Sequence, residues 1–432
     1  MESASNPTAP RDRMPGAIGP RLAGAALFAG LAGSAGALHA QVDTTTVAEL
    51  ERRIEILADE LELLRSGEQV QALTPDEARA LGLAPSAATA YAQESGASFA
   101  GYGEMLYENY SGDKTTQFDY LRVVIYAGYR FNEHFLFNAE IEVEHANETF
   151  IEFAYVDWRA TDSVGLRAGM LMMPVGLVNE LHEPTVFIGA ERPVTEQKII
   201  PSTWRENGAG LYGSSGPISY RLCVVNGFEG ASFSSGGLRG GRQKGIKAKA
   251  SSMAITGRLD YSPTPGFFVG VSGYRGGADH GELTAAGRNV DATVTIAEAH
   301  AQLQVRGFDF RGLVANATVG DVARLNQALD LSGSNGVGET LRGGYVQAGY
   351  DLLSQTLSDV SLLPYLRYEK VDTQAEVPSG YQRSLSNDNT YFTAGLELKP
   401  LPEVVLKIDH AWVTNDADSG VNQFNVNVGY AF

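Results

Sequence analysis

Apolar and polar residues alternate along most of this chain, from about residue 98 to its end. In the stretch "FLFNAEIEVEH", apolar side chains occupy every second position from Phe135 to Val143, and from Asn138 onward asparagine or glutamate fills the positions between them. The closing stretch, "NQFNVNVGYAF", alternates in the same way and ends on Phe432. Successive side chains of a β-strand point to opposite faces, so each stretch predicts a strand with one apolar and one polar face.

Sixteen segments with this pattern follow one another, and we predict a strand in each. They lie near residues 98–110, 116–131, 135–146, 150–160, 163–173, 203–213, 217–226, 247–261, 266–275, 292–306, 308–320, 342–354, 360–371, 390–399, 403–414 and 422–432. After every second strand the link is brief, as in "NE", "TD" and "SSG", whereas most of the other links are long and rich in Gly, Ser and Asp. The longest link, 174–203, follows the fifth strand. Short turns on one rim and long loops on the other are typical of an outer-membrane barrel.

The polar face distinguishes such a barrel from the alternative, a soluble β-sandwich. Glu140, Glu142 and Glu144 lie in a row on one face, and burying them in a packed core would be prohibitive. A water-filled lumen solvates these carboxylates, lipid accepts the apolar face, and closure of the sheet satisfies every backbone group. We therefore predict an all-β transmembrane fold over residues 98–432, a closed antiparallel barrel of about 16 strands in contact with the lipid of the bacterial outer membrane.

The chain begins with a pattern that predicts export. Arginines precede the apolar, uncharged stretch "LAGAALFAGLAGSAGAL", and small residues at Ala37 and Ala40 offer cleavage positions, so residues 1–40 are predicted to be a signal peptide. Met14 is an alternative start. A membrane anchor is the alternative function of the stretch, but it is short and glycine-rich for a spanning helix.

A second helical pattern follows directly, in "TTTVAELERRIEILADELELLRSGE". Apolar residues with alternating spacings of three and four predict a periplasmic coiled coil over residues 41–67, with one amphipathic helix packed on its own domain as the alternative. The seam consists of Val47, Leu50, Ile54, Leu57, Leu61 and Leu64. Residues 68–97 then form a small, polar linker with one short helix, because Thr74, Pro75 and Glu77 make a capping-box start.

Charge and composition exclude several functions. The net charge of -18 argues against nucleic acid, because phosphate binding needs clustered Lys and Arg. The single cysteine, Cys223, permits no disulfide within the chain and is expected to pack as a small residue. His182 and Glu183 are adjacent and therefore face apart, and the histidines show no ligand spacing, so neither a metal nor another cofactor is predicted. No Ser–His pairing suggests a barrel hydrolase, and we predict no enzymatic activity.

The coiled-coil opening, the block "GMLMMPVGLVNELHEPTVFIGAERPV" followed by "IIPSTWRENGAGLYG", and the ending "NVGYAF" together resemble the family of phosphate-selective porins O and P. The resemblance implies a sixteen-stranded homotrimer that conducts small solutes passively. It also implies that the long loop after the fifth strand folds inward and narrows the pore, and the strand count from the alternation independently places 174–203 there. The final Phe432 resembles the signal that the barrel assembly machinery reads in outer-membrane proteins.

Two groups of charged residues are the candidate site. The charges of the long loop are predicted to form the constriction, although a surface loop packed on a neighbouring subunit is an alternative. These loop residues are Glu180, His182, Glu183, Glu191, Arg192, Glu196 and Lys198. The second group shares the polar strand face that is predicted to line the pore. Its members are Arg122, Glu140, Glu142, Glu144, Arg167, Arg221, Arg258, Glu298, Arg311, Arg367, Lys407 and Asp409.

Acidic and basic residues therefore share the predicted pore wall. Opposed charges are what a general diffusion pore uses to orient dipoles and to set a weak ion preference. We predict a porin that admits small hydrophilic or charged solutes. Two alternatives are open: an anion- or phosphate-selective channel, and a structural envelope protein that uses the coiled coil as a tether.

Overall fold

The computed structural model of the protein describes residues 73–92, 95–161 and 163–432. The chain divides into two units, Met1–Gly67 and Glu68–Phe432, and every described residue belongs to the second unit. The predicted signal peptide (1–40) and coiled coil (41–67), including the seam from Val47 to Leu64, lie outside the described residues. Within the described part of the chain, no helix is both long and apolar enough to cross a membrane.

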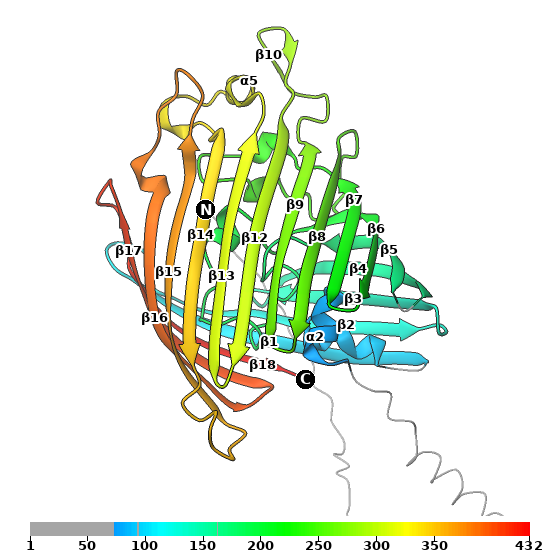
Figure 1. The fold of residues 1–432 in the computed structure, drawn as a ribbon. Helices are drawn as coiled ribbons and strands as arrows, with labels where there is room; N and C mark the ends of the chain where they lie inside the picture. The colour runs from blue at the N-terminus through cyan, green and yellow to red at the C-terminus, as the bar shows by residue number, and fades with distance from the viewer. Residues whose placement is uncertain (1–72, 93–94, 162) are drawn as a thin grey trace, which may run out of the picture. The chain divides into compact units, whose positions relative to one another are not determined.

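Sixteen antiparallel strands close into one barrel, in which each strand pairs with its neighbour along the chain and the last strand pairs with the first (Figure 1). They are β1 (Gly96–Tyr110), β2 (Gln117–Arg130), β3 (Phe135–Glu144), β4 (Glu148–Thr161), β5 (Val164–Met172), β6 (Arg205–Ser215), β7 (Ile218–Asn226), β8 (Met253–Thr264), β9 (Phe267–Gly277), β12 (Thr293–Val305), β13 (Phe308–Val319), β14 (Thr340–Tyr350), β15 (Ser361–Glu376), β16 (Asp388–Leu401), β17 (Val404–Asn415) and β18 (Gln423–Ala431). Barrel closure runs from the pair Tyr102 and Ala431 to the pair Tyr110 and Gln423.

The predicted fold is confirmed, and each of the sixteen predicted segments overlaps one strand of the barrel. The largest differences in the bounds concern β8, which begins at Met253 rather than at 247, and β15, which extends to Glu376 rather than to 371. Residues 247–252 alternate in sequence, but Lys247 has a positive φ of 46° and belongs to the loop that precedes β8. The alternation was therefore a local coincidence there, since a residue with positive φ cannot continue a strand.

The two faces of the wall differ as the alternation requires. On β3, Ile141 is 42% exposed on the outside, whereas its neighbours Glu140 and Glu142 are 0% and 1% exposed on the inside. Large apolar side chains are also exposed on other strands, for example Val156, Ile255 and Val314. The barrel therefore presents an apolar exterior to its surroundings and encloses a polar interior, which is the arrangement of a barrel in lipid.

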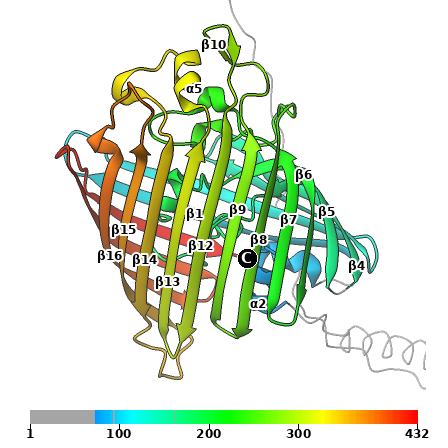
Figure 2. The same ribbon diagram turned by 45° about the horizontal axis from the view of Figure 1, so that its top comes forward.

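The two rims differ in the length of their connections. On one rim the links are short, such as 216–217, 265–266 and 306–307, whereas on the other rim the links 227–252, 278–292 and 320–339 are long. Helix α5 (Val322–Ala328) and the small hairpin of β10 (Thr284–Ala285) and β11 (Arg288–Asn289) belong to this long-loop rim, which comes forward in Figure 2.

Residues 73–92 pack at the short-turn end of the barrel. Helix α2 (Pro75–Ala80) begins with the capping box expected at Thr74 and Glu77, in which the Glu77 amide donates to the Thr74 hydroxyl over 3.3 Å. Two further turns follow, α3 (Pro85–Ala88) and η1 (Thr89–Tyr91), where only a small, polar stretch was expected. Their alanines are buried, and inner-wall side chains hydrogen-bond to this backbone: the Asn138 amide donates to the Ala87 carbonyl over 3.0 Å.

Candidate functional site: a loop folded into the barrel

The long link between β5 and β6 folds into the barrel interior. It contains one short helix, α4 (Thr195–Lys198). Several of its apolar residues are buried, and Val175, Ile199 and Trp204 are 0% exposed. Loop segments within the ring of strands are visible behind β13 and β14 in Figure 1. The alternation of short and long links predicts where this loop is, but the inward fold follows from its apolar residues, which obtain burial only inside the barrel.

Basic side chains of β13 to β17 hydrogen-bond to successive backbone carbonyls of this loop. The contacts, in loop order, are Lys399 to Thr185 at 2.7 Å, Arg311 to Val186 at 3.0 Å, Lys407 to Phe187 at 2.8 Å and to Gly189 at 3.0 Å, and Arg367 to Ile188 at 2.5 Å and to Glu191 at 3.2 Å. A loop inside a barrel has no strand partner for its carbonyls, and an unpaired buried carbonyl is costly. The cations therefore hold the loop in place by satisfying its backbone.

The acidic residues of the same wall bind the loop amides. The Ala190 amide donates to Asp409 over 2.7 Å, and the Val194 and Thr195 amides donate to Glu369 over 2.9 and 2.5 Å. Wall bases thus contact the loop where a C=O faces the wall, and wall acids contact it where an N–H does, since guanidinium and ammonium groups only donate and carboxylates only accept.

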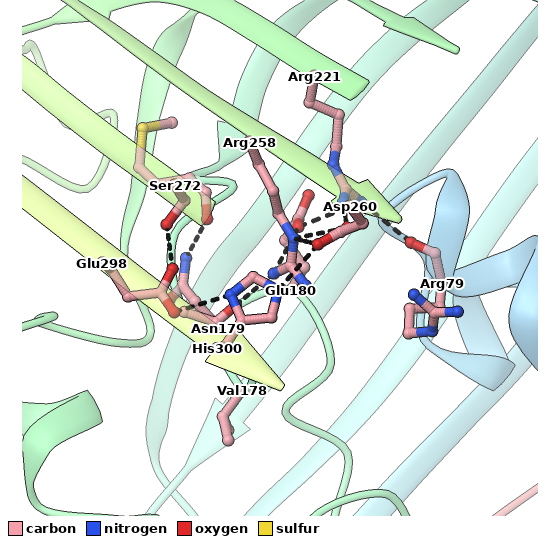
Figure 3. Close-up of polar contacts among 12 residues, drawn as sticks. Arg79, Val178, Asn179, Glu180, Arg221, Arg258, Asp260, Ser272, Glu298 and His300 are labelled. Atoms are coloured by element: carbon pink, nitrogen blue, oxygen red, sulfur yellow. Dashed lines mark hydrogen bonds and ion pairs between the residues drawn. The ribbon is translucent and has the colours of Figure 1, made fainter. Parts of the chain in front are cut away.

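A second network holds the other side of the loop (Figure 3). Asp260 on β8 lies at its centre and contacts Arg258 and Arg221, each at 2.8 Å. Loop residue Glu180 lies 3.3 Å from Arg221 and 3.9 Å from Arg258. Arg258 also donates to the carbonyl of Gly176, so this network binds both the side chain and the backbone of the loop.

His300 on β12 extends this network along the wall. Its Nε2 lies 2.8 Å from Asp260 and its Nδ1 lies 2.7 Å from Glu298, which also accepts a hydrogen bond from Ser272 over 2.5 Å (Figure 3). The Arg221 guanidinium donates to the Arg79 carbonyl over 3.0 Å and so joins the network to helix α2. The chain of contacts runs from β12 to residues 73–92, and it fixes the position of Arg221 and Arg258 in the lumen.

Glu196, in helix α4, connects the second part of the loop both to the first part of the loop and to the barrel wall. One of its carboxyl oxygens accepts from the Val178 amide over 2.6 Å, and the other accepts from the Tyr345 hydroxyl over 2.7 Å. Burial raises the pKa of Glu196 to about 7, although these two hydrogen bonds lower it in part. This carboxyl therefore changes charge within the range of ordinary environmental pH.

The other predicted loop charges lie in three different surroundings. Glu183 accepts from the Ser86 amide over 2.9 Å, so it binds the 73–92 segment. His182 points the other way, toward Glu152 at 2.7 Å and Glu140 at 3.4 Å. Glu191, Arg192 and Lys198 instead line a cavity on the long-loop side.

Cavities lie on both sides of the loop. A cavity of about 670 Å³ opens toward the short-turn side and is bordered by loop residues 185–188 together with Arg311, Glu397 and Lys399. A second cavity of about 500 Å³ lies toward the long-loop side and is bordered by Glu191 and Arg192. The loop segment between 185 and 192 therefore passes between the two cavities.

All of the residues predicted to line the pore lie on the inner face, but they differ in their relation to the loop. Arg122, Arg258, Arg311, Arg367, Lys407 and Asp409 hydrogen-bond to its backbone. Arg221 and Glu140 contact its side chains, and Glu142 lies behind Arg122 at 3.6 Å. Arg167 pairs with Asp157 of the neighbouring strand at 2.8 Å, and Glu144 is half-buried at the end of β3.

Sequence reasoning missed Glu152, which is 1% exposed inside the barrel. The register of β3 and β4 shifts between Glu140 and Ile141, so β4 carries an extra residue at this point and both Glu152 and Phe153 are buried. A β-bulge breaks the alternation of faces, and a period of two therefore cannot place residues across it. Glu369, Asp260 and Lys399 were missed for another reason, because each also contacts a residue that is distant in sequence: Thr195, Arg221 and Thr185, respectively.

The closed barrel, its apolar exterior, its charged interior and its inward loop define an outer-membrane β-barrel of the porin type. No protein-family model matches the chain. An uncharacterized protein of Aquifex aeolicus (strain VF5) is 38% identical over 346 residues, which cover 76% of this chain and 78% of that protein, and the chain belongs to the same family.

Solved structures show the same fold at low sequence identity. A loop L8 deletion mutant of OmpT, an outer membrane protein of Vibrio cholerae, aligns with a TM-score of 0.51 at 11% identity, over 79% of this chain and 100% of that one. OmpT of Vibrio cholerae folded in vitro, in its trimer form, aligns with a TM-score of 0.50 at 11% identity over the same shares of the two chains.

Proposed function

We propose that the protein is an outer-membrane porin through which small hydrophilic or charged solutes diffuse passively, and that loop 174–203 sets the narrowest part of the path. The observation that carries this proposal is the loop itself, which passes between two cavities inside a closed barrel and is bound to the wall by charged side chains. A loop held at that depth controls what crosses the barrel.

The charges that border the cavities favour a general diffusion path over a phosphate-specific one. A phosphate site needs guanidinium or ammonium groups that are free to bind an anion. Arg311, Arg367 and Lys407 instead donate to loop carbonyls, and the long-loop cavity sets Glu191 and Asp409 beside Arg192. Anion selectivity of the kind implied by the porin O and P resemblance is therefore the second candidate, with Arg192 and Lys198 as the cations that would provide it.

We further propose that the protein assembles as a homotrimer. The trimer form of Vibrio cholerae OmpT supports this by analogy of fold. The predicted coiled coil supports it from the sequence, because a short coil of this kind is marginal alone and gains stability when barrels hold its copies together.

Reconstitution in planar lipid bilayers tests the proposal. We expect stepwise conductance in groups of three, and the reversal potential in a salt gradient should show a weak ion preference. Charge reversal in Arg192→Glu, which changes a cavity residue, should shift this potential toward cation selectivity. Arg288→Glu is the matched control, because Arg288 is exposed on the β10–β11 hairpin.

A bilayer that stays silent with folded wild-type protein would contradict the porin function and favour the structural envelope protein. A strong anion preference that Arg192→Glu abolishes would instead favour the anion-selective channel.

A further inference from the structure

A compact group of ligand-type side chains lies where the loop meets β3 and β4. His182 of the loop, Glu140 of β3 and Glu152 of β4 are each 1% exposed or less. Their ligand atoms all lie within 4.8 Å of one another. They belong to three different elements of the chain, so no sequence motif identifies them.

One ligand-type atom of each side chain has no partner outside the cluster. Glu140 accepts from the Tyr102 hydroxyl on Oε1 over 2.9 Å, and Glu152 accepts from Arg205 on Oε1 over 3.1 Å. Oε2 of Glu140 is buried without a hydrogen-bond partner, and the buried Nε2 of His182 contacts only carboxylates of the cluster, with Oε2 of Glu152 at 2.7 Å and Oε1 of Glu140 at 3.4 Å. Unpaired buried polar atoms are rare in native proteins and indicate that something else satisfies them.

The imidazole orientation points to the same conclusion. Nδ1 of His182 lies 2.9 Å from the carbonyl of Asn179 and donates to it, so Nε2 is the ring nitrogen directed at the two carboxylates. Metal-bound histidines almost always donate their other ring N–H to a carbonyl or carboxylate, which fixes the ring in this way.

The local charge balance is negative. Four buried carboxylates, those of Glu104, Glu140, Glu142 and Glu152, lie within ion-pair distance of Arg122, Arg205 or His182. The two guanidiniums balance two of them, and a proton on His182 could balance only one more. A divalent cation that replaces this proton would balance both remaining charges, and buried charge without compensation is expensive.

We propose that His182, Glu140 and Glu152 bind a divalent first-row transition-metal ion of the Zn²⁺ type. One imidazole and two carboxylates suit such an ion, and solvent or Glu142 can supply a further oxygen. Because His182 belongs to the inward loop while both glutamates belong to the wall, the ion would fasten the loop to β3 and β4. The site is closed to solvent, so the ion enters as the loop docks and exchanges slowly afterwards.

Metal content after refolding tests this proposal on the full-length protein. The protein is unfolded in denaturant with EDTA, refolded into detergent with one equivalent of Zn²⁺, separated by gel filtration and analysed for zinc. We expect one zinc per chain in the wild type. We expect His182→Gln and Glu152→Gln to lower the affinity for zinc. The loss should be at least as large as the roughly 10–100-fold that follows removal of a residue hydrogen-bonded to a metal ligand.

A buried histidine from another loop provides the matched control. His280 is 5% exposed and contacts the carbonyl of Phe228 at 2.9 Å, so His280→Gln removes a buried imidazole outside the cluster and should retain the full zinc content. Unchanged zinc content in both ligand variants, or much less than one zinc in folded wild type, would overturn the proposal.

X-ray absorption at the zinc edge of the wild type decides the outcome even if the variants fail to fold. We expect one imidazole nitrogen and carboxylate oxygens at about 2.0–2.2 Å. A spectrum without imidazole would place the zinc elsewhere and would also overturn the proposal. Neither measurement depends on whether the barrel conducts.

Discussion

At the scale of single residues, many charged side chains of the inner wall hydrogen-bond to particular backbone atoms of the loop. Lys407 donates to two loop carbonyls, and Asp409, two positions further along β17, accepts from a loop amide. A sequence shows that these residues face inward, because the strand period is two, but it does not show which of them are free. Most side chains that were predicted to line the pore bind the loop or one another, whereas Arg192 of the loop borders the long-loop cavity.

The carboxyl of Glu196 predicts a pH dependence of loop docking. Its pKa is about 7 in the docked loop because burial raises it from the ordinary value of 4.5. The docked state therefore binds the proton more strongly than the undocked state. The stabilisation is fully present below about 4.5 and is lost as the pH rises through about 7, with an upper limit of about 3 kcal/mol.

Single-channel recordings at pH 5 and pH 8 check this. We expect the wild type to show larger conductance and more frequent loop openings at pH 8, and Glu196→Gln, which stays neutral, to behave at both values like the wild type at pH 5. Glu403→Gln, a change at an exposed carboxyl in the turn between β16 and β17, serves as the control. A pH dependence that Glu196→Gln leaves intact would assign it to another group.

At the scale of elements, strands were predictable and the contacts between loop and wall were not. Alternation is a local signal, so it located all sixteen strands. It was misleading at 247–252, which alternates without being a strand, and at the bulge beside Glu152. Helix α2 was predictable from its capping box, which is also local. Turns α3 and η1 were not, because their alanines gain helical order from burial against the wall rather than from their own sequence.

Lys407→Met tests whether the wall cations hold the loop. The change keeps the length of the side chain and removes the donor to the carbonyls of Phe187 and Gly189. A hydrogen bond from a charged group contributes about 1.5–3 kcal/mol, so the loop should undock more readily, with higher and noisier conductance and faster cleavage within residues 174–203 by added protease.

Lys370→Met is the matched control for this change, since Lys370 lies on β15 with half of its side chain exposed and pairs with Asp388. It should leave both readouts unchanged. Equal conductance and protease resistance in Lys407→Met and wild type would show that apolar burial alone keeps the loop in place.

At the scale of the whole molecule, closure of the barrel depends on the two ends of the described sheet. The amide of Phe432 donates to the Gly101 carbonyl over 2.8 Å, and the Gly101 amide donates to the Phe432 carbonyl over 2.8 Å. This pair ends the seam between β1 and β18, and the Phe432 ring is 66% exposed on the outside. The contributions of backbone and ring are therefore separable: the backbone completes the seam, and the exposed ring makes none of its hydrogen bonds.

Phe432→Ala separates these roles, because it keeps both backbone hydrogen bonds and removes only the ring. We expect a severalfold lower amount of folded barrel in the outer membrane of cells, measured by heat-modifiable migration, while protein refolded in detergent conducts like the wild type. Phe424→Ala removes another aromatic ring from β18, far from the closing pair, and should assemble normally. Normal assembly of Phe432→Ala in cells would exclude the ring as an assembly signal, and a loss of conductance after refolding would show that the ring stabilises the seam itself.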